Sequence, residues 1–461
     1  MNPLVQRREI FCETLPNLEA CVKRAMQLVG PKYGVIEKFE FEDLEPGEPP
    51  VFFARTCPSK YNPLNNSLSI NYGDAVSTNR NRALMKSLGE CIERYSSAFI
   101  DKQKLIKESY NGLKDNYPEA DPIDLEDTKY FLPGQYGSPG FPFSELSPDR
   151  KIHWAQCCSL KNGKPKWVPA QSIFIPFPSK EYGDLPFCDQ ISTGMACGPD
   201  RISSIYKGIL EVIERDAFMV NWLNRISPPE VEISTIRNPL AKELFETLSD
   251  LPVHAKMYSL TLDINAYVFL MVLENNSGVA PHTVMGLGAD LDPDKSLILA
   301  LEESLLTFIG MGRYARAKPD FTPDPNYQNI TTPTLHALSH ALCPDLKEGL
   351  EFLKSPPKIL KFEEFKPLAD MSDLNSGVKF LANELEDSDL EPFYFDLTTD
   401  DINQAGFKVA RVVIPGMQPL DINYNQKHLG VKRRWEVPEK LGLECNLEKD
   451  VEVNPFPHAF P

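Results

Sequence analysis

Three long helical segments dominate the pattern of apolar positions along the chain. They are expected at residues 79–100, within 192–220 and at 295–310. The first has one apolar stripe and a polar opposite face, which is typical of a helix at the surface. Apolar residues surround much of the second and third segments, so both are expected to be buried on several sides.

Shorter segments with helical or alternating apolar positions occupy the rest of the chain. Strands are expected within 36–53 and at 67–72, 154–160, 167–175, 253–260, 266–273, 392–396 and 409–414, and residues 283–288 lead into the third long helix. Further helices are expected within 1–30 and at 240–251, 335–343, 346–353 and 376–385. Segments 111–150 and 317–330 are expected to be irregular. The pattern predicts an α+β fold in which mixed or antiparallel sheets pack against helices.

A fixed spacing connects each long helix to a glycine before it. In each, a glycine stands 17 residues before a glutamate, in the pairs Gly73–Glu90, Gly194–Glu211 and Gly286–Glu303. The first two helices continue with a second glutamate and an arginine, as Glu93–Arg94 and Glu214–Arg215. A small residue precedes each leading glutamate by one turn, and these are Ser87, Gly208 and Ala300. Such a residue lets a ligand or another backbone come close.

The repeated carboxylates predict a cation site if the three helices face one another. The set comprises Glu90, Glu93, Glu211, Glu214 and Glu303. Repulsion among buried carboxylates raises their pKa values unless cations neutralise them. Oxygen ligands without His or Cys favour Mg²⁺, which usually arrives with phosphates. Arg94, Lys207 and Arg215 stand beside these carboxylates and suit a nucleotide polyphosphate. The chain has no GxxxxGK[ST] phosphate loop.

Composition and charge narrow the function classes. The chain of 461 residues has a net charge of −17, which argues against a nucleic-acid partner held through its phosphates. Its 42% hydrophobic and 25% charged residues are ordinary for a folded globular protein. No apolar run has the length of a signal-peptide core or a bilayer span. We therefore expect a cytoplasmic protein without a membrane or nucleic-acid partner.

Cysteines and histidines give little sign of a zinc site. Ten cysteines are scattered without a CxxC pair, so we expect reduced thiols rather than a disulfide framework. His336 and His340 lie one turn apart in a predicted helix, but Ala337 occupies the position at which a zincin motif requires glutamate. The pattern therefore favours two surface or packing histidines.

The last residues of the chain form a separate feature. Pro455, Pro457 and Pro461 are interleaved with Phe456 and Phe460 in the sequence NPFPHAFP. Proline favours an extended conformation, and a terminus without a partner frays. A frayed end has little use for so many prolines and aromatic rings. We therefore expect this tail to dock on the protein.

Several ordered motifs resemble the YcaO domain family. They are the SxxExxER element at Ser87–Arg94, the STGxAxG turn at Ser192–Gly198, the ExxERDA sequence at Glu211–Ala217, the GxGAxLDP-like segment at Gly286–Glu303 and the strand ending VIPGMQPL at Val413–Leu420. The match runs from about residue 60 to the C-terminus. The resemblance implies a YcaO-like fold whose acidic helices form a site for ATP and Mg²⁺.

The resemblance also implies residue roles. Mg²⁺ would be held by Glu90, Glu93, Glu211, Glu214 and Glu303, and the nucleotide by Ser87, Glu90, Arg94, Lys207, Glu211, Arg215 and Glu303. The catalytic domain would span residues 61–445. Residues 1–60 would form a cap or partner surface, and residues 446–461 a proline-rich tail that reaches the active site.

Known members of the family modify the backbone of ribosomally made peptides, and the azoline-forming ones end in a PxPxP motif similar to this tail. The resemblance thus implies an ATP-dependent cyclodehydratase that converts Cys, Ser or Thr residues into azolines by phosphorylating the backbone amide oxygen. Pro457, His458 and Pro461 would be its catalytic tail residues, and His458 or the terminal carboxylate would assist proton transfer.

Three positions depart from the family pattern. Asp74 stands where members often carry Lys, and Leu306 and Phe308 replace a common Gln and Arg. Individual nucleotide contacts are therefore expected to differ.

The implied partners are a precursor peptide, a separate ThiF-like protein that binds its leader, an FMN-dependent dehydrogenase that makes azoles, and further subunits of a homo- or hetero-oligomer. Two alternatives stay open. One is a YcaO enzyme that forms a thioamide or amidine, and the other is a non-catalytic scaffold subunit.

Overall fold

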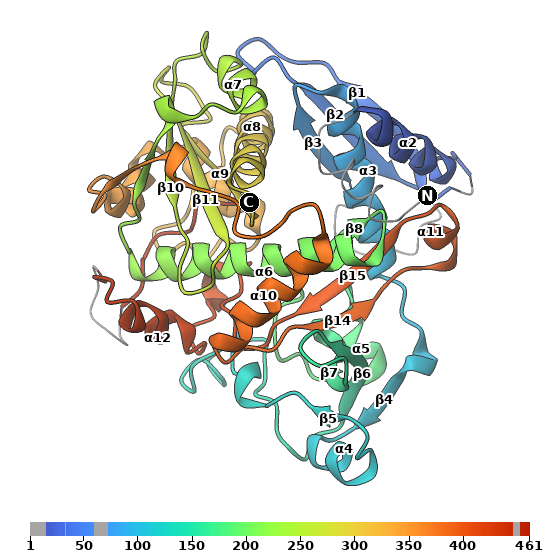
Figure 1. Ribbon diagram of the computed structural model, residues 1–461. Helices are drawn as coiled ribbons and strands as arrows, with labels where there is room; N and C mark the ends of the chain where they lie inside the picture. The colour runs from blue at the N-terminus through green and yellow to red at the C-terminus, as the bar shows by residue number, and fades with distance from the viewer. Residues whose placement is uncertain (1–14, 33, 60–71, 446–451) are drawn as a thin grey trace.

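Three β-sheets, each with a long helix against it, make up the protein (Figure 1). The computed structural model describes residues 15–32, 34–59, 72–445 and 452–461. The α+β class with mixed and antiparallel sheets is confirmed. In the described part of the chain, no helix combines the length and apolarity needed to cross a bilayer.

The first sheet is antiparallel and lies under α2 (Leu15–Ala25) and α3 (Arg80–Ser97). Its strands are β1 (Ile36–Glu42), β2 (Phe52–Pro58) and β3 (Gly73–Ser77), in that order. The strands expected within 36–53 are confirmed, whereas residues 67–71 of the next expected strand lie outside the described part. β3 begins at Gly73, directly after the expected strand.

The second sheet has seven strands, and all of its ladders are antiparallel except that between β5 and β7. Its strands are β4 (Leu105–Glu108), β5 (Asp121–Pro122), β6 (Ile152–Ser159), β7 (Pro165–Pro169), β8 (Met195–Gly198), β14 (Phe393–Asp396) and β15 (Lys408–Val413). β6 and β7 pair as an antiparallel hairpin across Asn162–Gly163, with Gly163 at φ 72°. The second long helix, α6 (Arg201–Asn224), packs against β8 and β15.

The third sheet has five strands in the order β12, β11, β10, β9, β13. Their bounds are β9 (Glu230–Glu232), β10 (Val253–Ser259), β11 (Tyr267–Asn275), β12 (Thr283–Asp290) and β13 (Ile359–Lys361). The third long helix, α8 (Pro293–Ala317), packs on β11 and β12 between α7 (Pro239–Glu246) and α9 (Pro333–Leu342). Every residue of β12 is buried, because helices cover the strand.

The other helices connect these three units. They are α4 (Tyr110–Asn116), α5 (Ser179–Tyr182), α10 (Leu374–Asp387), α11 (Asp400–Gln404) and α12 (Arg433–Lys440). Residues 344–353 form a 3-10 helix where an α-helix was expected. Residues 111–150 are largely irregular, as expected, although most of α4 falls among them.

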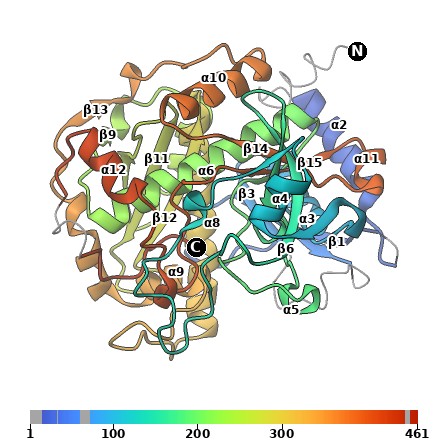
Figure 2. The same cartoon turned by 90° about the horizontal axis from the view of Figure 1, so that it is seen from below.

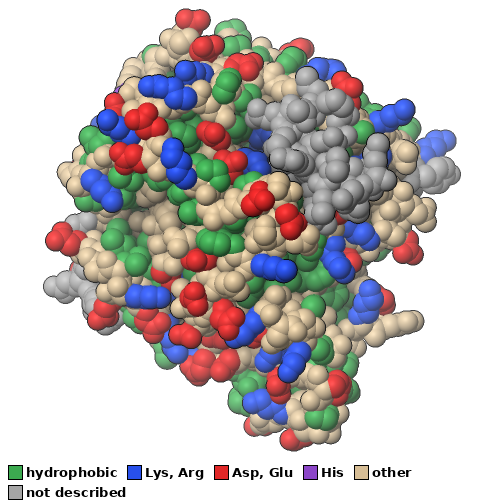
Figure 3. Space-filling view, in the orientation of Figure 1, with side chains coloured by type: hydrophobic (Ala, Val, Ile, Leu, Met, Phe, Trp, Pro, Cys, Tyr) green, Lys and Arg blue, Asp and Glu red, His purple; other side chains and the backbone are tan. Residues whose placement is uncertain are grey.

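The long helix α6 crosses the middle of the molecule between the second and third sheets (Figures 1 and 2). Its Asp216 is held by Arg433, whose guanidinium also binds Asp263. Buried charges need such partners, and this group ties the helix to the C-terminal part of the chain. On the face shown in Figure 3, Lys and Arg side chains are interspersed with Asp and Glu.

Candidate functional site

Helices α3, α6 and α8 surround a cavity of about 530 Å³. All five glutamates expected to hold Mg²⁺ line it, together with Arg94, Lys207 and Arg215. Strands β3, β8 and β12, which precede the three helices, supply backbone to the same cavity. The structure thus brings together residues that stand more than two hundred positions apart in the sequence.

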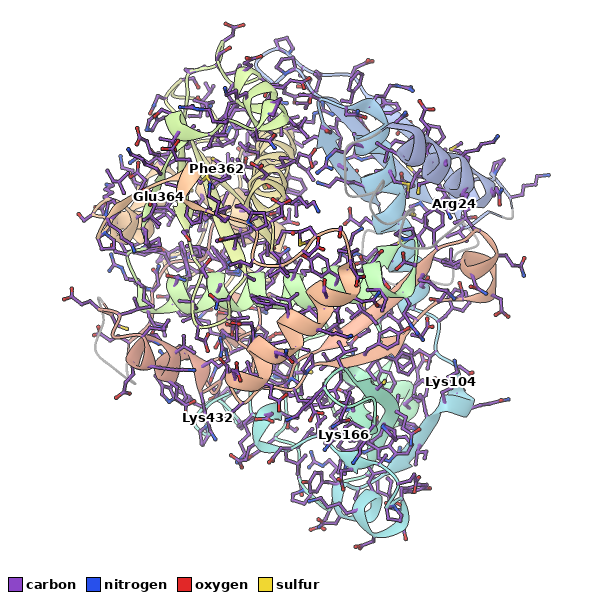
Figure 4. The ribbon with its side chains drawn as sticks, in the orientation of Figure 1. Arg24, Lys104, Lys166, Phe362, Glu364 and Lys432 are labelled. Atoms are coloured by element: carbon purple, nitrogen blue, oxygen red, sulfur yellow. The ribbon has the colours of Figure 1, made fainter. Side chains whose placement is uncertain are left out.

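Helix α2 also contributes to the cavity wall through Leu18 and Cys21. Arg24, on the same helix, has its guanidinium 5.5 Å from the ring of Phe407, another lining residue (Figure 4). The role of residues 1–60 as a cap or partner surface stays a prediction, and the described helix of this segment lines one wall of the cavity.

The 17-residue spacing has a common structural cause in the three units. The leading glutamate of each helix accepts a hydrogen bond from a backbone N–H near its glycine. The three bonds are Asp74 N to Glu90 at 3.1 Å, Gly194 N to Glu211 at 3.0 Å and Leu287 N to Glu303 at 2.5 Å. In every case the atom that accepts is Oε2, which leaves Oε1 directed at an arginine. The repeat therefore fixes the carboxylates in one orientation.

The glycines of the repeat allow each helix to lie close to backbone. A Cβ atom on Gly73 would stand 2.0 Å from the carbonyl oxygen of Ser87, and one on Gly286 would stand 2.2 Å from the amide of Ser304. Neither position has room for a side chain. Gly194, which has φ +87°, is similarly crowded by Val412.

Ser87 is an expected nucleotide ligand that the structure does not place in the cavity. It is fully buried, its hydroxyl donates to the carbonyl of Gly73 at 2.7 Å, and it lies 2.5 Å from the hydroxyl of Thr56. The small residue before the glutamate therefore serves close packing of helix on strand. The helical wheel shows that Ser87 lies on the face of Glu90, but it cannot show what lies opposite.

The arginines hold these carboxylates loosely. Arg94 lies 3.6 Å from Glu90 and 3.4 Å from Glu93. Arg215 contacts three carboxylates, at 3.8 Å for Glu211, 3.5 Å for Glu214 and 3.9 Å for Glu303. All these distances exceed those of direct hydrogen bonds. The carboxylates are therefore neutralised only in part by the protein.

Burial makes the charged form of these glutamates unfavourable. It raises the pKa of Glu93 to about 8 against the opposing effect of Arg94, and the neighbouring Glu211 adds to the rise. Burial likewise raises the pKa of Glu214 to about 8 despite Arg215, and Glu303 adds to it. Carboxylates in this condition bind a cation strongly, because the cation restores their charged form.

Sequence reasoning missed a second charged group in the cavity. Glu302 of α8 binds Arg82 at 2.7 and 3.1 Å and Lys86 at 2.9 Å, and all three residues line the cavity. Burial would raise the pKa of Glu302, but Arg82 and Lys86 outweigh it and lower this pKa to about 2. The i, i+4 spacing of Arg82 and Lys86 was the available signal.

The departures from the family pattern fall in different places. Asp74 lines the cavity and forms a bidentate pair with Arg55 at 2.7 and 2.9 Å. Leu306 also lines the cavity, whereas Phe308, on the same helix α8, is buried in the core. Lys207 lies in the cavity and donates to the carbonyl of Cys197 at 3.1 Å. Burial lowers the pKa of Lys207.

The C-terminal tail docks, as expected, next to α6. Phe460 is fully buried, and the Arg215 guanidinium lies 4.1 Å from its ring centroid. The three tail residues expected to be catalytic do not line the cavity. The carbonyl of Pro457 faces His340 at 2.7 Å, and His458 contacts the carbonyl of Asp421. Pro461 remains partly exposed.

The packing interpretation of the two histidines on α9 is confirmed. His336 and His340 are both buried, and the ring of His336 stacks on His458 of the tail at 4.0 Å. They form the seat on which the tail rests. Among the residues that the structure describes, no three His, Cys, Asp or Glu side chains converge closely enough to hold a metal ion by themselves.

A family profile described as YcaO cyclodehydratase, ATP- and Mg²⁺-binding, matches residues 76–418. The chain belongs to the YcaO family. An uncharacterized protein of Methanothermobacter thermautotrophicus is 26% identical over 349 residues, which are 75% of this chain and 81% of that protein.

Solved structures share the YcaO fold with this chain. A heterocyclase in complex with substrate and cofactor has a TM-score of 0.75 and 20% identity over 96% of this chain. The chain spans 57% of that heterocyclase, just over half its length. YcaO from Methanopyrus kandleri, bound with AMPPCP and Mg²⁺, has a TM-score of 0.62 and 18% identity, and the match covers 87% of this chain and 91% of that one.

The cavity fits the ATP and Mg²⁺ of the YcaO family. Mg²⁺ keeps several waters and takes one or two carboxylates plus phosphate oxygens. It therefore needs no closed set of three protein ligands, and the loosely held carboxylates offer Oε1 atoms of the required kind. Arginine and lysine side chains on the same walls supply the donors that phosphates accept.

Proposed function

We propose that the protein is an ATP-dependent cyclodehydratase that converts Cys, Ser or Thr residues of a ribosomally made precursor peptide into azolines. The observation that supports this most strongly is the buried tail against Arg215. A proline-rich end that supports a residue of the nucleotide site is what the azoline-forming branch of the family leads us to expect.

In this proposal Glu90, Glu93, Glu211, Glu214 and Glu303 hold Mg²⁺, and Arg94, Lys207 and Arg215 bind the nucleotide together with the leading glutamates. ATP supplies a phosphoryl group that turns the amide oxygen of the peptide into a good leaving group. The arginines stabilise the charge that develops during the transfer. Three of these carboxylates are held by backbone amides in or directly before a strand, so the site is organised before ligands arrive.

The peptide itself provides the nucleophile. Its Cys, Ser or Thr side chain adds to the preceding carbonyl carbon, and the resulting oxygen is phosphorylated. Loss of phosphate, with a proton from the former amide nitrogen, then leaves the C=N bond of a thiazoline or oxazoline. His458 fits proton transfer poorly, because it is buried and bonded to Asp421.

We further propose the partners implied by the resemblance. They are a ThiF-like protein that presents the leader of the precursor, and an FMN-dependent dehydrogenase where azoles are the product. The reaction would take place in the cytoplasm, and the protein would act as part of a homo- or hetero-oligomer.

The decisive test mixes the purified protein with a precursor peptide, ATP and Mg²⁺, with and without the ThiF-like partner. The expected result is loss of one water per modified residue, seen by mass spectrometry, only when the partner is present. Full activity without the partner would contradict the partner proposal. No mass change and no peptide-dependent ATP hydrolysis under either condition would favour the scaffold alternative.

Residues added after Pro461 separate the two enzyme alternatives. They should abolish azoline formation, because the docked tail has a fully buried Phe460. An enzyme that uses an external nucleophile to form a thioamide or amidine should tolerate the extension better.

A further inference from the structure

Lys86 holds a distinct place among the cations of the cavity. It lies on α3 one turn after Arg82 and one turn before Glu90, so all three side chains follow one face of the helix. Its ammonium lies 2.9 Å from Glu302 across the gap between α3 and α8. Its side chain is 36% exposed, and it lines the cavity.

Arg82 alone is enough to neutralise the carboxylate of Glu302. The guanidinium of Arg82 binds both of its oxygens, through Nε to Oε1 at 2.7 Å and through Nη2 to Oε2 at 3.1 Å. Such a two-point pair neutralises a carboxylate with good geometry. The ammonium of Lys86 uses one of its three donors on the same carboxylate. Its charge is therefore only partly offset by Glu302.

Lys86 also lies next to the carboxylates expected to hold Mg²⁺. Glu90 of α3 and Glu303 of α8 line the cavity together with Lys86. Lys86 therefore lies where the α3 and α8 walls of the cavity approach each other, joined to α8 through Glu302. Arg215, in contrast, has three loosely held carboxylates around it.

A purely structural role explains these contacts less well. An ion pair that only joined α3 to α8 would be complete with Arg82 and Glu302. It would not need a second cation, and burying that cation fully would make the contact stronger. Lys86 is instead partly open to the cavity and anchored at its tip, which preorganises its remaining donors.

We propose that Lys86 is a phosphate-binding residue for a nucleoside di- or triphosphate, and that Glu302 with Arg82 forms the positioning pair that aims it. The inference deepens the proposed function at the same nucleotide site, and no sequence motif marked these residues. Its test uses binding without any peptide. A failure here would therefore leave the cyclodehydratase proposal standing, and the converse also holds.

The test measures binding of ADP with Mg²⁺ and of adenosine to the full chain by calorimetry. Lys86→Met should weaken ADP about tenfold or more, as expected for a lost charge-assisted hydrogen bond. Adenosine, which has no phosphate, should bind unchanged. Lys86→Arg should recover most of the ADP affinity, and Glu302→Gln should lie between the wild type and Lys86→Met.

Arg313→Met is the matched control. Arg313 also joins α8 to the first sheet unit by an ion pair, with Glu48 at 2.7 Å, but it lies outside the cavity lining. It should leave both affinities unchanged. Equal weakening of ADP and adenosine by Lys86→Met, or no weakening of either, would assign Lys86 to the helix interface and overturn the proposal.

Discussion

Two buried polar clusters lie on either side of Arg215, and burial shifts the pKa values of their side chains in opposite directions. On one side, Glu214 and its neighbouring carboxylates have raised pKa values because their charge is poorly compensated. On the other side, burial lowers the pKa of the tail-seat histidines His336, His340 and His458, that of His340 to about 4. The carboxylates of the first cluster need cations to neutralise their charge, whereas the neutral histidines of the second need none.

The difference separates a ligand site from a packing site. His340 and His458 each bond a backbone carbonyl through Nε2, that of Pro457 and that of Asp421. The other ring nitrogens of these two histidines and both of His336 are buried without a hydrogen-bond partner among the described residues, but the rings are neutral and packed. Carboxylates at the other cluster keep an oxygen directed at an arginine more than 3.4 Å away. A buried charge that its neighbours leave poorly compensated is a functional candidate.

The largest expected effect is the loss of a cluster carboxylate. Glu214→Gln should reduce peptide-dependent ATP hydrolysis about a hundredfold or more, because it removes a candidate Mg²⁺ ligand from a buried site. The measurement is hydrolysis rate against Mg²⁺ concentration. Glu243→Gln on the exposed face of α7 is the control and should behave as the wild type. Equal rates in the two variants would contradict the proposal that the carboxylate cluster binds the Mg²⁺ used in ATP hydrolysis.

The repeat itself can be broken at a glycine. Gly286→Ala should lower the free energy of unfolding by about 2–3 kcal/mol, because its Cβ would meet the backbone of α8. Gly310→Ala, on the same helix with nothing within 4 Å of its Cβ, should instead add about 0.5–1 kcal/mol. Denaturant unfolding measures both. A neutral Gly286→Ala would show that β12 and α8 do not need this close approach.

Loss of the contact between Phe460 and Arg215, which joins the two clusters, is expected to have a moderate effect on ATP affinity. Phe460→Leu keeps an apolar side chain but removes the ring beside Arg215, and should weaken ATP affinity about two- to thirtyfold, as loss of a cation–π contact of about 0.5–2 kcal/mol implies.

Phe456→Leu provides the control within the same tail. Phe456 packs against Gly349 and Tyr327, outside the contact with Arg215. It should affect stability more than affinity. If both variants weakened ATP equally, the tail would act through general docking, and its support of Arg215 would be refuted.

The tail seat should respond to acid. Histidines with lowered pKa values stabilise the fold fully above their unfolded pKa near 6.5, and this stability is lost as pH falls toward the folded values. For His340 the loss should be about 1 kcal/mol between about pH 7 and about pH 5.5. The charged or titratable groups that face them are Asp421, Lys427, Arg215 and the histidines themselves.

Thermal unfolding at the two pH values tests this. His340→Gln keeps a polar side chain near Pro457 without a titrating group, so it should show a smaller loss of stability at acid pH than the wild type. An identical pH dependence in the two proteins would show that the buried imidazoles do not cause the loss.

The sequence predicted those parts of the site that repeat along the chain. The spacing from Gly73 to Glu90 recurs because one backbone amide within or directly before the strand bonds to one carboxylate in each unit. Contacts between the three strand–helix units produce no such regular spacing in the sequence. Glu302 lies one residue before Glu303, and only the position of α8 across the cavity from α3 shows that it binds Lys86.

Ser87 shows what helical periodicity alone does not predict. Helical periodicity placed it on the face of Glu90, but the approach of Thr56 from β2 buries it. Docking of the tail followed from its composition, whereas the pairing of Phe460 with Arg215 depends on where α6 runs. Local patterns thus predict elements and faces, and tertiary contacts decide what each face meets.

The most direct test is a crystal structure of the protein with a non-hydrolysable ATP analogue and Mn²⁺, located by its anomalous signal. We predict that Mn²⁺ lies beside at least one carboxylate of the cluster, with phosphate oxygens within hydrogen-bonding distance of Lys86 or Arg215. A nucleotide outside the cavity, or one whose phosphates point away from these residues toward Leu18 of α2, would contradict the account.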